Sequence, residues 1–164
     1  MKTNIVLIGL TGCGKTTIGS KLSQELHMNY VDVDEDIELH YGPIKSLFEN
    51  GEEYFRNIES QRVESLSKQN NTIISTGGGV VLRASNMKTL KSTGIIFFLE
   101  RPIEEIILTI DTTNRPLLKN GTEALYQLYI VRESLYRNYS DYVIQISNID
   151  QATSTIASFW KKKL

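Results

Sequence analysis

Residues 9–16 read Gly9-Leu10-Thr11-Gly12-Cys13-Gly14-Lys15-Thr16 and match the pattern G-x-x-x-x-G-K-[ST] at every fixed position. An apolar run, Asn4–Leu10, enters this segment and predicts a buried strand, and an amphipathic stretch, Lys15–Leu26, leaves it and predicts a helix. The glycines let the backbone curl so that successive N–H groups face a phosphate, and the helix adds its positive end. The pattern therefore predicts a nucleotide-binding P-loop.

Within this loop the residue types assign roles. The Lys15 ammonium can bridge β- and γ-phosphate oxygens, and the Thr16 hydroxyl can ligate Mg²⁺. We therefore expect ATP and Mg²⁺ as cofactors, with the nucleotide held by Gly12, Cys13, Gly14, Lys15, Thr16 and Thr17. Cys13 fits either a redox switch or a small side chain that fills the loop, and we favour the second interpretation.

The rest of the chain alternates short apolar runs with longer amphipathic stretches. Further strands are predicted at Asn29–Asp32, Thr72–Ser75, Gly94–Leu99 and Tyr142–Ile146. Helices are predicted at Asp34–Tyr41, Ile44–Glu49, Glu52–Lys68, Ser85–Lys91, Ile103–Thr109, Glu123–Asn138 and Thr153–Lys162. This alternation predicts a parallel sheet covered by helices on both faces, a three-layer α/β/α fold of the P-loop NTPase type, with ligands beyond the carboxyl ends of the strands.

Composition limits the classes of function. The chain has 164 residues, 40% hydrophobic and 23% charged, with a net charge of −1, so we expect one globular domain over residues 1–164. No global positive field is available for nucleic acid or an anionic membrane. The run Ile5 to Leu10 is too short to span a bilayer, and the single cysteine cannot form an internal disulfide. With no signal peptide before that run, we expect a cytoplasmic protein and, by default, a monomer.

The P-loop alone does not define the reaction. The N-K-x-D and D-x-x-G motifs of GTPases are absent from the sequence, and the predicted strand Thr72–Ser75 does not end in a Walker B aspartate. Asp32 and Asp34 supply carboxylates instead, and in a strand residues two apart point to the same side. One can hold Mg²⁺, directly or through water, and the other can accept or orient the proton of an attacking hydroxyl.

Several further motifs follow in a fixed order: Gly42-Pro43-Ile44-Lys45-Ser46-Leu47-Phe48, G-E-x-x-F-R-x-x-E over 51–59, Thr76-Gly77-Gly78-Gly79, Arg115-Pro116-Leu117-Leu118, and Arg132 with Tyr136. Together with the P-loop and the aspartate pair, they make the chain resemble the shikimate kinases of the nucleoside-monophosphate-kinase-like P-loop group. The resemblance covers most of the chain. It implies a five-stranded parallel sheet in the order 2-3-1-4-5 and phosphoryl transfer from ATP to the 3-hydroxyl of shikimate, a step of aromatic amino acid biosynthesis.

The resemblance also implies roles for individual residues. Asp34 would contact the hydroxyls of shikimate and act as base, or align the hydroxyl, which leaves Asp32 and Thr16 for Mg²⁺. Arg56 and Arg132 would hold the shikimate carboxylate beside the backbone of Gly77, Gly78 and Gly79. Arg115, on a lid over Asp111–Gly121, would close over the phosphates as a catalytic and nucleotide-binding residue.

One position departs from the family pattern. An arginine that packs on the adenine ring usually lies shortly before the R-P-L-L motif, and here Leu108-Thr109 occupies that position. We therefore expect weaker selectivity for adenine.

Two alternative functions stay open. One is a kinase for another small acceptor such as gluconate, which would not need two arginines for one carboxylate. The other is a nucleotide-binding regulatory module without catalysis.

Overall fold

The computed structural model describes residues 1–110, 116–118 and 121–163. Five strands form one parallel sheet in the order β2-β3-β1-β4-β5, which confirms the predicted fold class and strand order. The strands are β1 (Asn4–Ile8), β2 (Asn29–Asp32), β3 (Thr72–Ser75), β4 (Gly94–Glu100) and β5 (Tyr142–Gln145). In the central register, Val6 pairs with Ile74 on one side and with Ile96 on the other.

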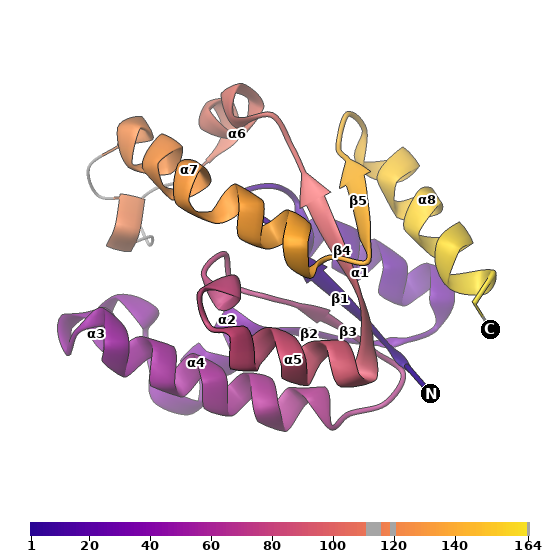
Figure 1. Ribbon diagram of the computed structural model, residues 1–164, viewed down its shortest axis with the longest axis horizontal. Helices are drawn as coiled ribbons and strands as arrows, with labels where there is room; N and C mark the ends of the chain where they lie inside the picture. The colour runs from indigo at the N-terminus through magenta and orange to yellow at the C-terminus, as the bar shows by residue number, and fades with distance from the viewer. Residues whose placement is uncertain (111–115, 119–120, 164) are drawn as a thin grey trace.

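Helices cover the sheet (Figure 1). They are α1 (Lys15–Leu26), α2 (Val33–Tyr41), α3 (Ile44–Glu49), α4 (Glu52–Ser67), α5 (Ala84–Thr93), α6 (Ile103–Thr109), α7 (Thr122–Tyr139) and α8 (Ile149–Lys161), with 3-10 turns η1 (Val80–Leu82) and η2 (Pro116–Leu118). Helices α1 and α8 pack against each other, and α2, α3 and α4 form a second group beside β2. Strands β1 and β3 are buried along their whole length, so the core lies at the middle of the sheet.

Two helix starts differ from the predicted ones because of capping side chains. Asn148 Oδ1 accepts a hydrogen bond from Gln151 N at 2.9 Å, so α8 begins at Ile149 rather than at Thr153. Asp32 Oδ1 accepts from Asp34 N at 2.9 Å and from Glu35 N, so α2 begins immediately after β2. Asp34 therefore lies in the first turn of a helix, in keeping with the predicted helix Asp34–Tyr41, and the strand spacing that was expected to place it on the same side as Asp32 does not apply to it.

No helix in the described ranges is long and apolar enough to cross a membrane.

Candidate active site

The P-loop connects β1 to α1 at the carboxyl edge of the sheet. Gly9, Gly12 and Gly14 have φ values of 151°, 79° and 109°, in the region that favours glycine. Gly14 occupies the N-cap of α1 and has no side chain to cap the helix, so the first N–H groups of α1 are left for an anion. Cys13 is fully buried, which favours the packing interpretation of its side chain over a redox role.

Lys15 lies inside this loop. Its Nζ donates to the backbone oxygen of Gly9 at 2.7 Å and to that of Leu10 at 3.1 Å, and its side chain is largely buried. The loop's own carbonyl groups thus hold the ammonium at the place where the pattern predicts a phosphate. A nucleotide phosphate would replace neutral acceptors with charged ones, which make stronger hydrogen bonds.

Thr16 and Asp32, the two residues predicted to hold Mg²⁺, lie next to each other. Thr16 Oγ1 donates to Asp32 Oδ2 at 3.1 Å, while Asp32 Oδ1 caps α2. The described residues include no group of three or more His, Cys, Asp or Glu side chains placed to hold a metal ion. One hydroxyl and one carboxylate nevertheless suit Mg²⁺, which keeps several waters and takes further oxygens from substrate phosphates.

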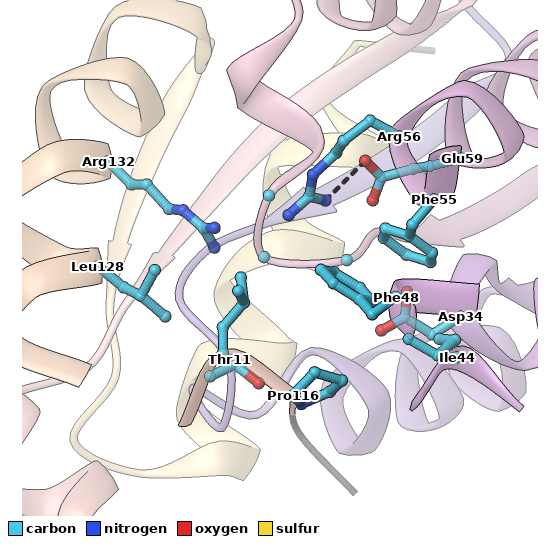
Figure 2. Close-up of a pocket in the computed structure, with 14 residues that line it drawn as sticks. Thr11, Asp34, Ile44, Phe48, Phe55, Arg56, Glu59, Pro116, Leu128 and Arg132 are labelled. Atoms are coloured by element: carbon cyan, nitrogen blue, oxygen red, sulfur yellow. Dashed lines mark hydrogen bonds and ion pairs between the residues drawn. The ribbon is translucent and has the colours of Figure 1, made fainter. Parts of the chain in front are cut away.

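Two cavities meet above this edge. The P-loop cavity, of about 510 Å³, is lined by Gly12, Gly14, Lys15, Thr16, Thr17, Asp32, Ser75, Thr76, Arg101 and Ile149, among others. The arginine cavity, of about 100 Å³, is lined by Arg56, Arg132, Glu59, Gly79, Phe48 and Leu128, among others (Figure 2). Thr11, Asp34, Gly77 and Gly78 line both. The shared wall means that a molecule in one cavity would adjoin a molecule in the other at Asp34.

Arg56 and Arg132 come from different helices and enter the arginine cavity from opposite sides (Figure 2). Their exposed fractions are 6% and 4%, so neither is an ordinary surface charge. Arg56 Nη1 donates to Glu59 Oε1 at 2.9 Å and Nη2 to Glu52 Oε1 at 3.3 Å. Two guanidinium groups in one small cavity can bind one carboxylate with defined orientation.

The three glycines after β3 make room for these side chains. A Cβ on Gly79 would lie 2.3 Å from Arg56 Nη2, and a Cβ on Gly77 would lie 2.8 Å from Asp34 Oδ1. The loop itself is held by Thr76 Oγ1, which donates to the Leu7 oxygen at 2.8 Å, and by the Tyr136 hydroxyl, which donates to the Gly78 oxygen at 2.5 Å. A Cβ at Gly77 or Gly79 would therefore force Asp34 or Arg56 to shift from its position in the site.

Comparison with known proteins agrees with this geometry. The family model described as "Shikimate kinase" matches residues 11–161. A shikimate kinase of Clostridium botulinum (strain Eklund 17B / Type B) is 44% identical over 158 residues, covering 95% of this chain and 96% of the relative. The chain belongs to the shikimate kinase family.

Other members of the family support the same assignment. A shikimate kinase of Clostridium beijerinckii is 46% identical over 146 residues, covering 88% of this chain and 86% of the relative. The solved structure of a shikimate kinase from Acinetobacter baumannii in complex with shikimate has a TM-score of 0.92 and 34% identity, covering 100% of this chain and 96% of that one. The interpretation of the sequence as a kinase of this family is confirmed.

Glu59 is a residue of this shikimate kinase site to which sequence reasoning gave no role. Its side chain is fully buried, and within the described part of the chain its Oε2 has no hydrogen-bond partner. Burial raises the pKa of Glu59, and the charge of Arg56 opposes that rise. A signal was present in the sequence, because Arg56 and Glu59 are three residues apart on a predicted helix and so share a face.

The structure describes one of the two positions near the lid for which the sequence made predictions, Leu108, and does not describe the other, Arg115. Arg115 lies outside the described residues, as does most of the predicted lid 111–121, so the role given to Arg115 stays a prediction. Leu108 lies on α6 with 84% of its surface exposed, and it lines neither the P-loop cavity nor the arginine cavity.

Proposed function

We propose that this chain transfers the γ-phosphate of ATP to the 3-hydroxyl of shikimate. The observation that carries the proposal is the pair of cavities that meet at Asp34. The P-loop cavity has the size and the N–H groups that a nucleotide needs, and the arginine cavity has two buried guanidinium groups suited to a small carboxylate. A phosphoryl donor and an acceptor hydroxyl would thus approach each other at the shared wall.

Each side chain has a distinct part in this reaction. Lys15 exchanges the Gly9 and Leu10 oxygens for phosphate oxygens and stabilises the charge that develops on them. Arg56 and Arg132 bind the shikimate carboxylate and so fix the ring, while Asp34 orients the hydroxyl or accepts its proton. The role predicted for Arg115 from the sequence, neutralising charge on the phosphates, completes the set.

Thr16 and Asp32 would hold Mg²⁺. When bound, this ion neutralises charge on the β- and γ-phosphate oxygens. The Asp32 carboxylate also caps α2, so it keeps Asp34 at the shared wall of the two cavities. We place the enzyme in the cytoplasm as a monomer. Its small net charge provides no global field for nucleic acid or an anionic membrane, so we expect it to bind neither.

The experiment is a coupled assay for ADP release with shikimate, gluconate and other small acids as acceptors. Turnover that depends on shikimate, with phosphate on the 3-oxygen by phosphorus and proton NMR, supports the proposal. Preference for gluconate would indicate another small-acceptor kinase. Nucleotide binding without turnover on any acceptor would indicate a regulatory module. Light scattering of the purified protein tests the monomer.

A further inference from the structure

The sheet order divides the P-loop cavity into two ends. The P-loop follows β1, at the centre of the sheet, and Asp34 follows β2, on one side of it. Arg101 follows β4 and Ile149 follows β5, on the other side, and both line the P-loop cavity. A nucleotide with its γ-phosphate toward Asp34 must therefore extend its base toward Arg101 and Ile149.

Arg101 is held rigidly at that end. Its Nη1 donates to the Gly12 oxygen at 3.3 Å and to Thr109 Oγ1 at 3.2 Å, and its Nε lies 3.5 Å from Glu105 Oε2. The guanidinium group thus connects three places: the P-loop at Gly12, the first turn of α6 at Glu105 and the end of α6 at Thr109. These bonds lie at the edge of the group, so they do not use its flat faces.

Ile149 supplies an apolar wall in the same cavity. It is the first residue of α8, placed there by the Asn148 cap, and its Cδ1 lies 3.1 Å from the position that a Cβ on Gly14 would take. An apolar side chain above the P-loop and a planar cation anchored to the P-loop form a site suited to a flat aromatic ring. The phosphates do not need Arg101, because Lys15 and the N–H groups of the loop already serve them.

We propose that Arg101 determines the binding of the donor's base, with its guanidinium face against the purine. The role of Arg101 rests on the proposed function only in taking ATP as the donor. It also explains how this chain binds the base with an exposed leucine at position 108. The edge bonds to Gly12 and Thr109 fix the plane of the guanidinium, so a lysine, which has no plane, cannot replace it.

The test compares two probes, ATP and inorganic tripolyphosphate, each with Mg²⁺ and without shikimate. Arg101→Met should weaken ATP binding by about two- to thirtyfold, the range for losing a cation–π contact, and Arg101→Lys should recover less than half of the lost binding free energy. Tripolyphosphate, which has no base, should lose no more affinity than it does in the matched control Arg137→Met. Arg137 is an exposed arginine on α7 that lines neither the P-loop cavity nor the arginine cavity.

The outcomes separate the possible roles. Equal losses for ATP and tripolyphosphate would mean that Arg101 acts on the phosphates or on the shape of the P-loop, and unchanged ATP affinity would mean that it does not face the base. Either result overturns the role of Arg101. Failure of the proposed function is distinct, because it would show as absent turnover on shikimate in a protein whose ATP binding still depends on Arg101.

Discussion

The carboxylate of Glu59 lies 2.9 Å from Nη1 of Arg56, one turn away on α4, and both side chains are buried. This hydrogen bond holds the Arg56 guanidinium next to Gly79, at the wall of the arginine cavity. Glu59 is thus a positioning residue for the group that is proposed to bind the acceptor's carboxylate.

This pair predicts a pH dependence of stability. Burial raises the pKa of Glu59 above its value in the unfolded chain, so from about pH 4 upward the folded protein binds more protons than the unfolded chain. The free energy of unfolding should therefore fall as pH rises through the raised pKa. The difference in bound protons belongs to Glu59 and ends above its raised pKa, where the group is ionised in both states. Urea unfolding of wild type and Glu59→Gln from about pH 4 to pH 7 measures this. A difference between the two proteins that does not change with pH would contradict the raised pKa.

The P-loop lysine gives the second prediction. Lys15→Ala should lower turnover by roughly 100-fold or more, because the lysine's charge acts on the transferring phosphoryl group, and should leave the thermal transition cooperative. Lys21→Ala, an exposed lysine on the same helix, is the matched control. Turnover near that of the control would remove Lys15 from the reaction.

The two buried arginines give the third prediction. Arg132→Leu and Arg56→Leu should each weaken shikimate binding by roughly ten- to a hundredfold, since each loses a charge-assisted hydrogen bond. ATP affinity should not change. Arg132→Leu is the cleaner variant, because removing Arg56 also strands the buried Glu59 carboxylate. A shikimate analogue without its carboxylate that reacts as well as shikimate would exclude this role for both arginines.

Gly79 gives the fourth prediction. Its φ of −95° suits any residue, so Gly79→Ala should act only through the Cβ, which would meet Arg56 Nη2 at 2.3 Å. The displaced guanidinium should raise KM for shikimate and leave ATP affinity unchanged. In a double-mutant cycle, Gly79→Ala should add little to Arg56→Leu, because the two changes act on the same contact. Additive effects would show that the glycine serves some other purpose.

Local patterns predicted much of this molecule. The structure agrees with the predicted strand Asn29–Asp32, with the predicted helix Lys15–Leu26 and with a loop between the first apolar run and that helix. Each of these depends on residues that are close together along the chain. The strand end at Asp32 was predicted correctly, but the argument that Asp32 and Asp34 point to the same side used strand spacing for a residue that lies in a helix. The Asp32 carboxylate caps the next helix, so the extended conformation ends at Asp32 and the helix begins at Val33.

The positions of the three arginines at the site depend on tertiary contacts, which local sequence patterns do not show. From the sequence alone, Arg56 and Arg132 resemble surface charges on two helices. In the fold they are buried, because α4, α7 and the loop of residues 77–79 come together around them. Arg101 had no motif to mark it, because its position in the P-loop cavity depends on the place of β4 beside β1 in the sheet. Only the assembled fold brings these residues to the same edge of the sheet.

Position 108 gives the last prediction. Leu108 is exposed on α6, next to Thr109, whose hydroxyl accepts a hydrogen bond from Arg101. Selectivity for ATP over GTP should be weaker than the family pattern implies, because a leucine stands where the family has an arginine on the adenine ring. Leu108→Arg should raise ATP affinity and the ATP/GTP ratio, because it restores the guanidinium that the family pattern places against the adenine ring.

The gain from Leu108→Arg should be larger in an Arg101→Met background than in the wild type, since the two guanidinium groups would compete for the same ring. Titration of all four proteins with ATP and GTP completes the cycle. ATP affinity that stays unchanged in both backgrounds would show that residue 108 does not face the base. The family's adenine-packing arginine would then have no counterpart at this position, and of the two positions only the proposed contact of Arg101 with the base would remain.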